Sequence, residues 1–206
     1  MDAELMLDVG QANELKLAFR RSGWTSADVK KLSEGDIAIQ LLPVIRGLAK
    51  IVPVEIFRKV ATVVVNGTEK FVAKDHLKEA NVGWTSDNFK KLFLDKAEEG
   101  VKAATIVVHR LERDSLDAPI LTELGSHVET KLAHFFELLK TQSKGESDTL
   151  LTNGYANIAY IKGNDGNFWA VRAYWYSGLG YWHVRANSVD YPYRWPAGSL
   201  VLSCDS

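Results

Sequence analysis

Hydrophobic side chains recur with a helical period in residues 126–144. They form one stripe on a helical projection, made by Val128, Leu132, Phe135, Phe136 and Leu139. Ser126 and Glu129 have the spacing of a capping box at the start of this helix, and Gly145 can end it. The pattern predicts an amphipathic helix whose apolar stripe packs on a sheet, either the middle strands of the chain or its Trp-rich end.

The N-terminal part of the chain is also helical in its pattern. In the stretch QANELKLAFRRS, Leu15 and Phe19 fall on one face of a helix, and Ser33 can cap a further helix. Pro43 either kinks that second helix or starts a new one. An N-terminal helical segment is therefore predicted over residues 1–50.

The pattern changes to strands in the middle region, residues 51–145. The stretch KVATVVVNGTEKFVA places β-branched residues on both sides of Asn66 and Gly67, a strong signal for a hairpin. Residues 102–111, KAATIVVHRL, predict a third strand, and residues 117–125 predict a short helix. We therefore expect a small mixed α/β region that ends in the amphipathic helix.

Aromatic residues concentrate in the C-terminal part, since all seven Tyr and four of the six Trp lie after residue 150. The turn sequences NDGN and SGLG divide this part into three strands, and residues 199–203 are a candidate fourth strand. The pattern predicts a three- to four-stranded antiparallel β-meander. The whole chain is thus expected to have an α+β fold in three parts, residues 1–50, 51–145 and 150–206.

The two turns determine which residues of the meander share a face. Turn centres at Asp165-Gly166 and Gly178-Leu179 place Trp175 opposite Trp182. The first face is apolar and typical of a core; it holds Ala156, Ile158, Tyr160, Trp169, Val171, Ala173, Trp175, Trp182, Val184 and Ala186. The second face is polar, aromatic and basic; it holds Tyr155, Asn157, Ala159, Arg172, Tyr174, Tyr176, Tyr181, His183, Arg185 and Asn187.

The second face is the main candidate for a binding surface. Its composition is typical of a surface for a polar partner or of a stacking platform for nucleobases, although a solvated or covered strand face can have the same composition. Arg172 and Arg185 are predicted to lie directly opposite each other, and like charges so placed destabilise a sheet. An intramolecular carboxylate, separated side chains in solvent or a bound anion would relieve this conflict.

We therefore expect a non-enzymatic interaction or binding module whose partner is an unknown protein or an anionic ligand. Its expected binding residues are Arg172, Arg185, Tyr174, His183, Tyr176, Tyr181, Tyr155 and Asn157. Single-stranded nucleic acid is a less favoured partner, because 25 Lys and Arg residues are balanced by 26 Asp and Glu residues.

The sequence GWTSADVKKL (23–32) recurs as GWTSDNFKKL (83–92). If Thr25 and Thr85 are N-caps, each preceding Trp can form a hydrophobic staple with the residue at the fourth helical position. A pair of Trp ligand sites is the functional alternative. We interpret the repeat as two helix starts.

Several stretches resemble uncharacterised bacterial proteins known from environmental genome sequences. They are GWTSADVKKLSEGD (23–36), DNFKKLFLDKAEE (87–99), LLTNGYANIAYI (150–161) and the spaced Trp, Ser-Val, Pro and Trp of WHVRANSVDYPYRW. The resemblance implies a bacterial origin and carries no assigned chemistry or site residue.

Charge and hydropathy limit the other functional classes. The net charge of −1 provides no overall attraction to nucleic acid or to an anionic membrane, and the longest apolar run near the N-terminus contains Pro43 and charged residues. Residues 1–10 are acidic where a secretory signal is basic, and Cys204 is the lone cysteine. We expect a cytoplasmic protein without a membrane span.

An enzyme is the alternative class. A small hydrolase could use Ser115, which lies near His109, Asp114 and Asp117 in the sequence, or the helix face shared by His127 and His134. Glu123 and Glu137 could join the two histidines, but neither spacing is a recognised metal-ligand pattern. No nucleotide-binding or hydrolase motif is present, so we expect no cofactor, no metal and no catalytic residue in the leading interpretation.

Overall fold

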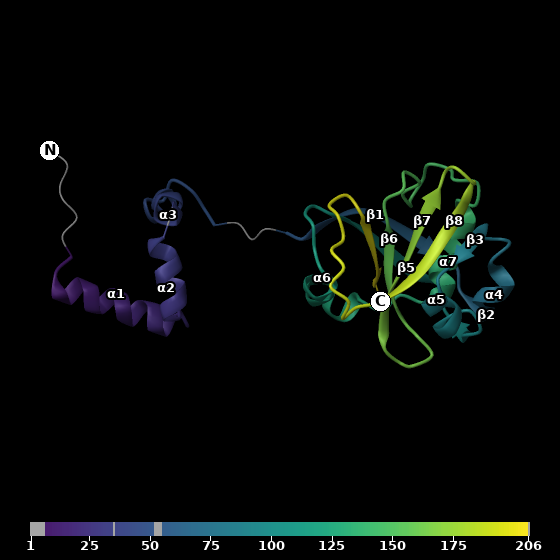
Figure 1. Ribbon diagram of the computed structural model, residues 1–206, viewed down its shortest axis with the longest axis horizontal. Coiled ribbons are helices and arrows are strands. Elements are labelled where there is room, and N and C mark those ends of the chain that lie inside the picture. Colours follow the sequence, from purple (N-terminus) through teal and green to yellow (C-terminus); the bar gives the residue numbers. More distant parts are fainter. Residues whose placement is uncertain (1–6, 35, 52–54, 206) are drawn as a thin grey trace. The chain divides into compact units, whose positions relative to one another are not determined.

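The computed structural model describes residues 7–34, 36–51 and 55–205. These residues belong to two compact units, residues 1–54 and residues 55–206 (Figure 1). The α+β class predicted from the sequence is confirmed.

The first unit consists of three helices in its described part: α1 (Val9–Arg21), α2 (Ser26–Ser33) and α3 (Ile37–Ile45). None of its described residues is buried. Ser33 is the last residue of α2 rather than the cap of the next helix, because its hydroxyl donates to the carbonyl of Lys30. Pro43 lies inside α3.

The repeated GWTS sequence begins two helices, but with different caps. In the first copy, Thr25 caps α2 in a capping box with Asp28, as predicted. In the second copy the prediction is wrong by one residue: Ser86 caps α5 (Asp87–Leu92), because Thr85 is buried at the end of β3 (Val82–Thr85). Strand pairing holds Thr85 in an extended conformation.

The second unit is built on a large mixed sheet. In the described residues its order is β1-β5-β9-β6-β7-β8-β3, and it has seven strands. The remaining strands are β1 (Phe57–Val65), β5 (Ala104–Leu111), β6 (Asn157–Lys162), β7 (Phe168–Tyr176), β8 (Tyr181–Ser188) and β9 (Leu200–Asp205). Strands β9 and β6 are parallel neighbours, so β9 does not extend the meander but joins it to β5. The segments 51–145 and 150–206 thus share one sheet.

The predicted hairpin at Asn66 and Gly67 does not form. Strand β1 pairs with β5, whereas β2 (Thr68–Val72) pairs with β4 (Ala97–Val101) in a separate two-stranded sheet. Gly67 lies so close to the 101–103 backbone that an added Cβ would be 2.7 Å from the nitrogen of Ala103. The Asn-Gly turn therefore leads from one sheet into another.

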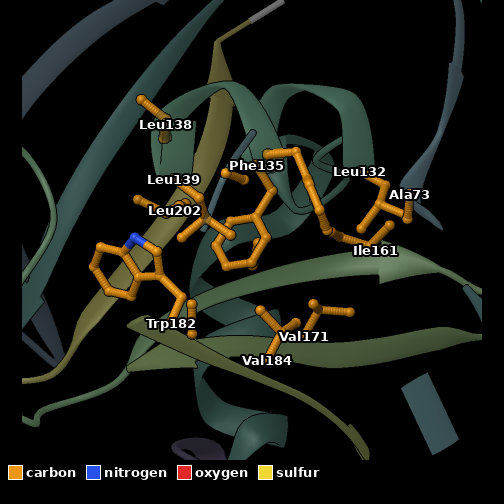
Figure 2. Close-up of a cluster of buried hydrophobic side chains, with 14 of the residues drawn as sticks. Ala73, Leu132, Phe135, Leu138, Leu139, Ile161, Val171, Trp182, Val184 and Leu202 are labelled. Carbon is orange, nitrogen blue, oxygen red and sulfur yellow. The ribbon is translucent and has the colours of Figure 1, made fainter. Parts of the chain in front are cut away.

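Helix α7 (Leu132–Thr141) covers one face of the large sheet. Its Leu132, Phe135 and Leu139 pack on apolar side chains of the sheet that include Ile161, Val171, Trp182, Val184 and Leu202 (Figure 2). The short helices α4 (Ala73–His76) and α5 also contribute to this cluster. The β7 and β8 residues of the predicted Trp face cover the apolar stripe of the helix, together with Ile106 and Val108 of β5. Val128 of the predicted stripe packs in the cluster on the other face of the sheet instead.

The start of this helix differs from the prediction. Helix α7 begins at Leu132 rather than 126, because the carboxylate of Glu98 in β4 accepts the backbone N–H groups of Leu132 and Ala133. Ser126 lies in the 3-10 turn η1 (Gly125–His127), and Glu129 pairs with lysine side chains instead of forming a capping box.

The opposite face of the sheet is covered over β1, β5, β9 and β6 and over the first part of β7, where Ala170 is buried. Helix α6 (Asp117–Leu124) and the segment containing Trp195 pack there on a second buried cluster that includes Leu111, Tyr160 and Val201. The rest of this face, formed by β7, β8 and β3, carries polar and aromatic side chains.

The antiparallel order β6-β7-β8 of the meander is confirmed, but only one of its two predicted pairing registers is correct. The β7–β8 pairs follow the prediction, whereas the β6–β7 pairing is shifted by one residue and places Ile158 opposite Arg172. The first turn is displaced because the Asp165 carboxylate accepts from the backbone of Asn167 and from the indole of Trp169. Alternate residues of β6 consequently face the opposite side from the one expected.

Candidate functional site

The candidate site is a patch of side chains on β7, β8 and β3, which we call the aromatic-basic face. It consists of Trp84, Arg172, Tyr174, Tyr176, Tyr181, His183 and Arg185. Alternation along each strand places these residues on one side, while Val171, Ala173, Val184 and Trp182 face the α7 core. Trp84 is 39% exposed and Tyr176 is 44% exposed, so the patch is open to solvent.

His183 lies at the centre of the face. Its Nδ1 is 2.8 Å from the hydroxyl of Tyr174, and its ring contacts those of Trp84, Tyr176 and Tyr181. Burial and the neighbouring positive charge of Arg185 lower the pKa of His183 below its usual value. The imidazole is therefore mainly neutral at pH 7, and its buried Nε2 has no hydrogen-bond partner among the described residues.

Glycine at position 83 makes room for the face. An added Cβ would be 2.7 Å from Cδ1 of Tyr181, so only hydrogen at this position lets the phenol ring lie against β3. The pairing between β3 and β8 also shifts register between Val82 and Trp84. This irregularity brings Trp84 directly beside His183.

Arg172 and Arg185 are direct partners across β7 and β8, as predicted. The guanidinium of Arg185 lies 4.8 Å from the ring centroid of Trp84, whereas that of Arg172 lies 4.9 Å from that of Tyr193 and donates to the Tyr193 hydroxyl. Trp195 also lies under Arg172. The two positive groups thus point apart, and each is stabilised by a cation–π contact.

No carboxylate of the described residues forms an ion pair with either arginine. The Nε atoms of Arg172 and Arg185 are buried and have no hydrogen-bond partner in the described part of the chain. The repulsion between the two arginines is thus not offset by a carboxylate of the described residues. It is reduced because the two side chains point apart.

A hollow of about 380 Å³ adjoins the face beside Arg172. It is lined mainly by aromatic side chains and by the two loops that flank β6 and β9: Asn153, Gly154, Tyr155, Ala156, Arg172, Tyr174, Tyr193, Trp195 and Pro196. Tyr155 is exposed at its rim. The hollow therefore combines one guanidinium group with aromatic walls.

One predicted binding residue, Asn157, does not belong to the face. The shifted β6 register turns it toward the α7 side, where it is fully buried and bonds to the backbone of Leu151 and Ala173. Its role is to fix the loop that precedes β6. Conversely, sequence reasoning missed two neighbours of the face. Trp84 comes from β3, nearly a hundred residues before His183, and Tyr193 comes from the irregular segment between β8 and β9, for which the strand pattern gives no position.

The proposed hydrolase residues have other partners. Ser115 pairs with Trp195 through the backbone, and its hydroxyl donates to the carbonyl of Leu116. His109 instead bonds to Ser203 at 2.9 Å. Asp117 is buried and accepts from Tyr160 and Trp195, so it positions the loop that carries Trp195.

The two histidines of the predicted amphipathic helix do not share a helix face. His127 lies in η1 with its Nδ1 near the carbonyl oxygen of Cys204, whereas His134 is buried in α7 with its Nε2 against the carbonyl of Lys102. Among the residues that the structure describes, no three His, Cys, Asp or Glu side chains are grouped so as to hold a metal ion.

The helices in the described ranges are too short or too polar to cross a lipid bilayer. Comparison of the chain with protein-family models, curated proteins and solved structures found no match.

Proposed function

We propose that this protein is a non-enzymatic binding module and that the aromatic-basic face is its binding surface. The observation that carries the proposal is the pair of arginines, Arg172 and Arg185, which lie half-buried on adjacent strands without a carboxylate partner in the described residues. Buried or half-buried charges in proteins are usually paired, so an unpaired couple on one surface favours a function in binding.

The chemistry of the face favours an anionic partner. Guanidinium groups bind carboxylates and phosphates through two parallel hydrogen bonds, and the cation–π contacts with Trp84 and Tyr193 hold both groups in place before a ligand arrives. Preorganised side chains lose less entropy on binding. The neutral His183 and the tyrosine hydroxyl groups add further polar contacts.

A capture experiment from native lysate tests this proposal. The full chain and the double variant R172Q/R185Q are immobilised side by side, with and without nuclease treatment of the lysate. The control variant R110Q/R113Q removes the same charge from exposed arginines elsewhere in the unit. We expect a partner that the wild type and the control retain, that the double variant loses, and that salt of about 0.5 M weakens.

Equal capture by the wild type and the R172Q/R185Q variant would contradict the proposal, provided that both proteins show the same thermal unfolding. The nuclease arm tells a protein partner from a nucleic acid.

A further inference from the structure

We infer that the aromatic-basic face binds an acidic, proline-containing peptide in the polyproline II conformation, with two carboxylates three residues apart, one at Arg172 and one at Arg185. This inference rests on the proposed function, and it specifies the class of the partner.

The spacing of the carboxylates follows from the directions of the two guanidinium groups. Arg185 extends from β8 toward Trp84 on β3, and Arg172 extends from β7 the other way, toward Tyr193 and Trp195. Because neighbouring strands lie about 5 Å apart, groups displaced outward from two such strands have centres on the order of 10 Å apart. One carboxylate cannot bridge them, so two acidic groups are needed.

The backbone conformation of the peptide follows from two requirements: its two carboxylates must be about 10 Å apart, and both must point toward the same face of the protein. Polyproline II has three residues per turn and rises about 3.1 Å per residue, so residues i and i+3 lie on the same side about 9 Å apart. In a β-strand, by contrast, residues three apart point to opposite sides. Of these two conformations, only polyproline II directs the carboxylates of residues i and i+3 toward the face at the required separation.

The aromatic side chains support the same conclusion. Surfaces lined by Tyr and Trp bind proline-rich segments, whose preformed helix loses little entropy on docking. The hollow beside Arg172, with Tyr155, Tyr174 and Tyr193 in its walls, offers apolar ring surface at one end of the face. The exposed Tyr176 and Trp84 supply O–H and N–H donors for the free carbonyl groups of such a peptide.

A nucleic acid fits the face less well. Single-stranded nucleic acid is held by a groove of many positive charges that follows the backbone, together with rings on which bases stack. The face has two guanidinium groups and no lysine, and its central rings contact one another around His183. Discrete carboxylates match two discrete cations better than a continuous phosphate chain does.

Fluorescence anisotropy with labelled synthetic peptides tests the inference on the full chain. The probe is a twelve-residue peptide of proline and alanine with two glutamates at positions i and i+3. The matched peptides carry glutamine at both positions, move the glutamates to i and i+2, or replace every proline by alanine. A labelled oligothymidylate is the competing probe.

We expect the i, i+3 peptide to bind, and each of R172Q and R185Q to weaken it about tenfold, the loss typical of one charge-assisted hydrogen-bonded contact. The exposed Arg113 provides a control substitution, R113Q, that should leave binding unchanged. The glutamine, i, i+2 and proline-free peptides should each bind at least about tenfold more weakly.

Equal binding of the i, i+3 and i, i+2 peptides would overturn the inference, and so would tighter binding of oligothymidylate than of any peptide. In both cases the proposed function survives if the capture experiment still depends on Arg172 and Arg185. If that experiment is insensitive to the two arginines, the proposed function fails as well.

Discussion

The phenol ring of Tyr181 lies directly against the backbone of Gly83 on the neighbouring strand β3. This contact lets Tyr181 stack with His183 at 5.2 Å between ring centroids, and His183 in turn contacts Trp84. The aromatic-basic face is therefore organised by a residue without a side chain. Its ring positions depend on the close approach of β3 to β8.

Replacement of Gly83 by alanine should disturb the face. The added methyl group would meet the Tyr181 ring within 2.7 Å of Cδ1, so the ring or β3 must move, and overpacking of this kind costs about 1–3 kcal/mol. Gly178→Ala is the matched control, because its Cβ would meet Tyr176 Cε1 at 3.6 Å, an ordinary contact. Urea unfolding checks both variants, and equal stability of G83A and the wild type would show that the ring moves without cost.

The sequence predicted those parts of the fold that depend on local pattern. The cap at Thr25, the apolar stripe of α7 and the pairing of Arg172 with Arg185 are set by residues close together in the chain or joined by a tight turn. The tight SGLG turn at residues 177–180 allows only one simple pairing register between β7 and β8. The prediction is correct there because a tight turn leaves few alternative strand registers.

The rest depends on contacts between distant segments. Glu98 sets the start of α7 from a strand more than thirty residues earlier, and Asp165 changes the first turn by bonding to Trp169. The parallel pairing of β3 with β8 brings Trp84 to the face, although nearly a hundred residues separate it from His183. Periodicity within one segment contains no information about such pairings.

Glu98 should be important for the stability of the second unit. Its buried carboxylate accepts the first N–H groups of α7 at 3.1 Å and 2.9 Å and pairs with Lys96. Glu98→Ala leaves these buried donors without a partner, and we expect a loss of about 2–3 kcal/mol in the free energy of unfolding. The exposed neighbour Glu99 provides the control, since E99A should change stability by less than about 0.5 kcal/mol.

Residues 55–206 should fold without the first unit. Both buried clusters lie in this part of the chain, whereas none of the described residues in 7–51 is buried. The free energy of unfolding depends mainly on buried apolar surface. We expect the fragment 55–206 to unfold cooperatively in urea with a midpoint within experimental error of that of the full chain. A fragment that is unfolded in buffer would show that the helices of the first unit stabilise the second.

The stability of the protein should also depend on pH through Asp117. Its buried carboxylate accepts from the Tyr160 hydroxyl at 2.6 Å and from the indole of Trp195 at 2.8 Å, while its second oxygen has no partner in the described residues. Burial raises the pKa of Asp117 above the usual 3.8, and the two hydrogen bonds oppose this shift only in part. The folded protein therefore holds this proton to a higher pH than the unfolded chain does.

A group whose pKa is raised in the folded state stabilises the protein most when both states are protonated. The contribution of Asp117 should thus be complete below pH 3.8 and be lost as the pH rises through its pKa in the folded protein. Asp117→Asn keeps an oxygen acceptor for Tyr160 and Trp195 but does not titrate. We expect the stability of the wild type relative to D117N, measured by urea unfolding over a pH series, to fall with rising pH and then to level off. Other titrating groups cancel in this difference. A difference that grows with pH would mean that the two hydrogen bonds outweigh burial and that the carboxylate is charged in the folded protein.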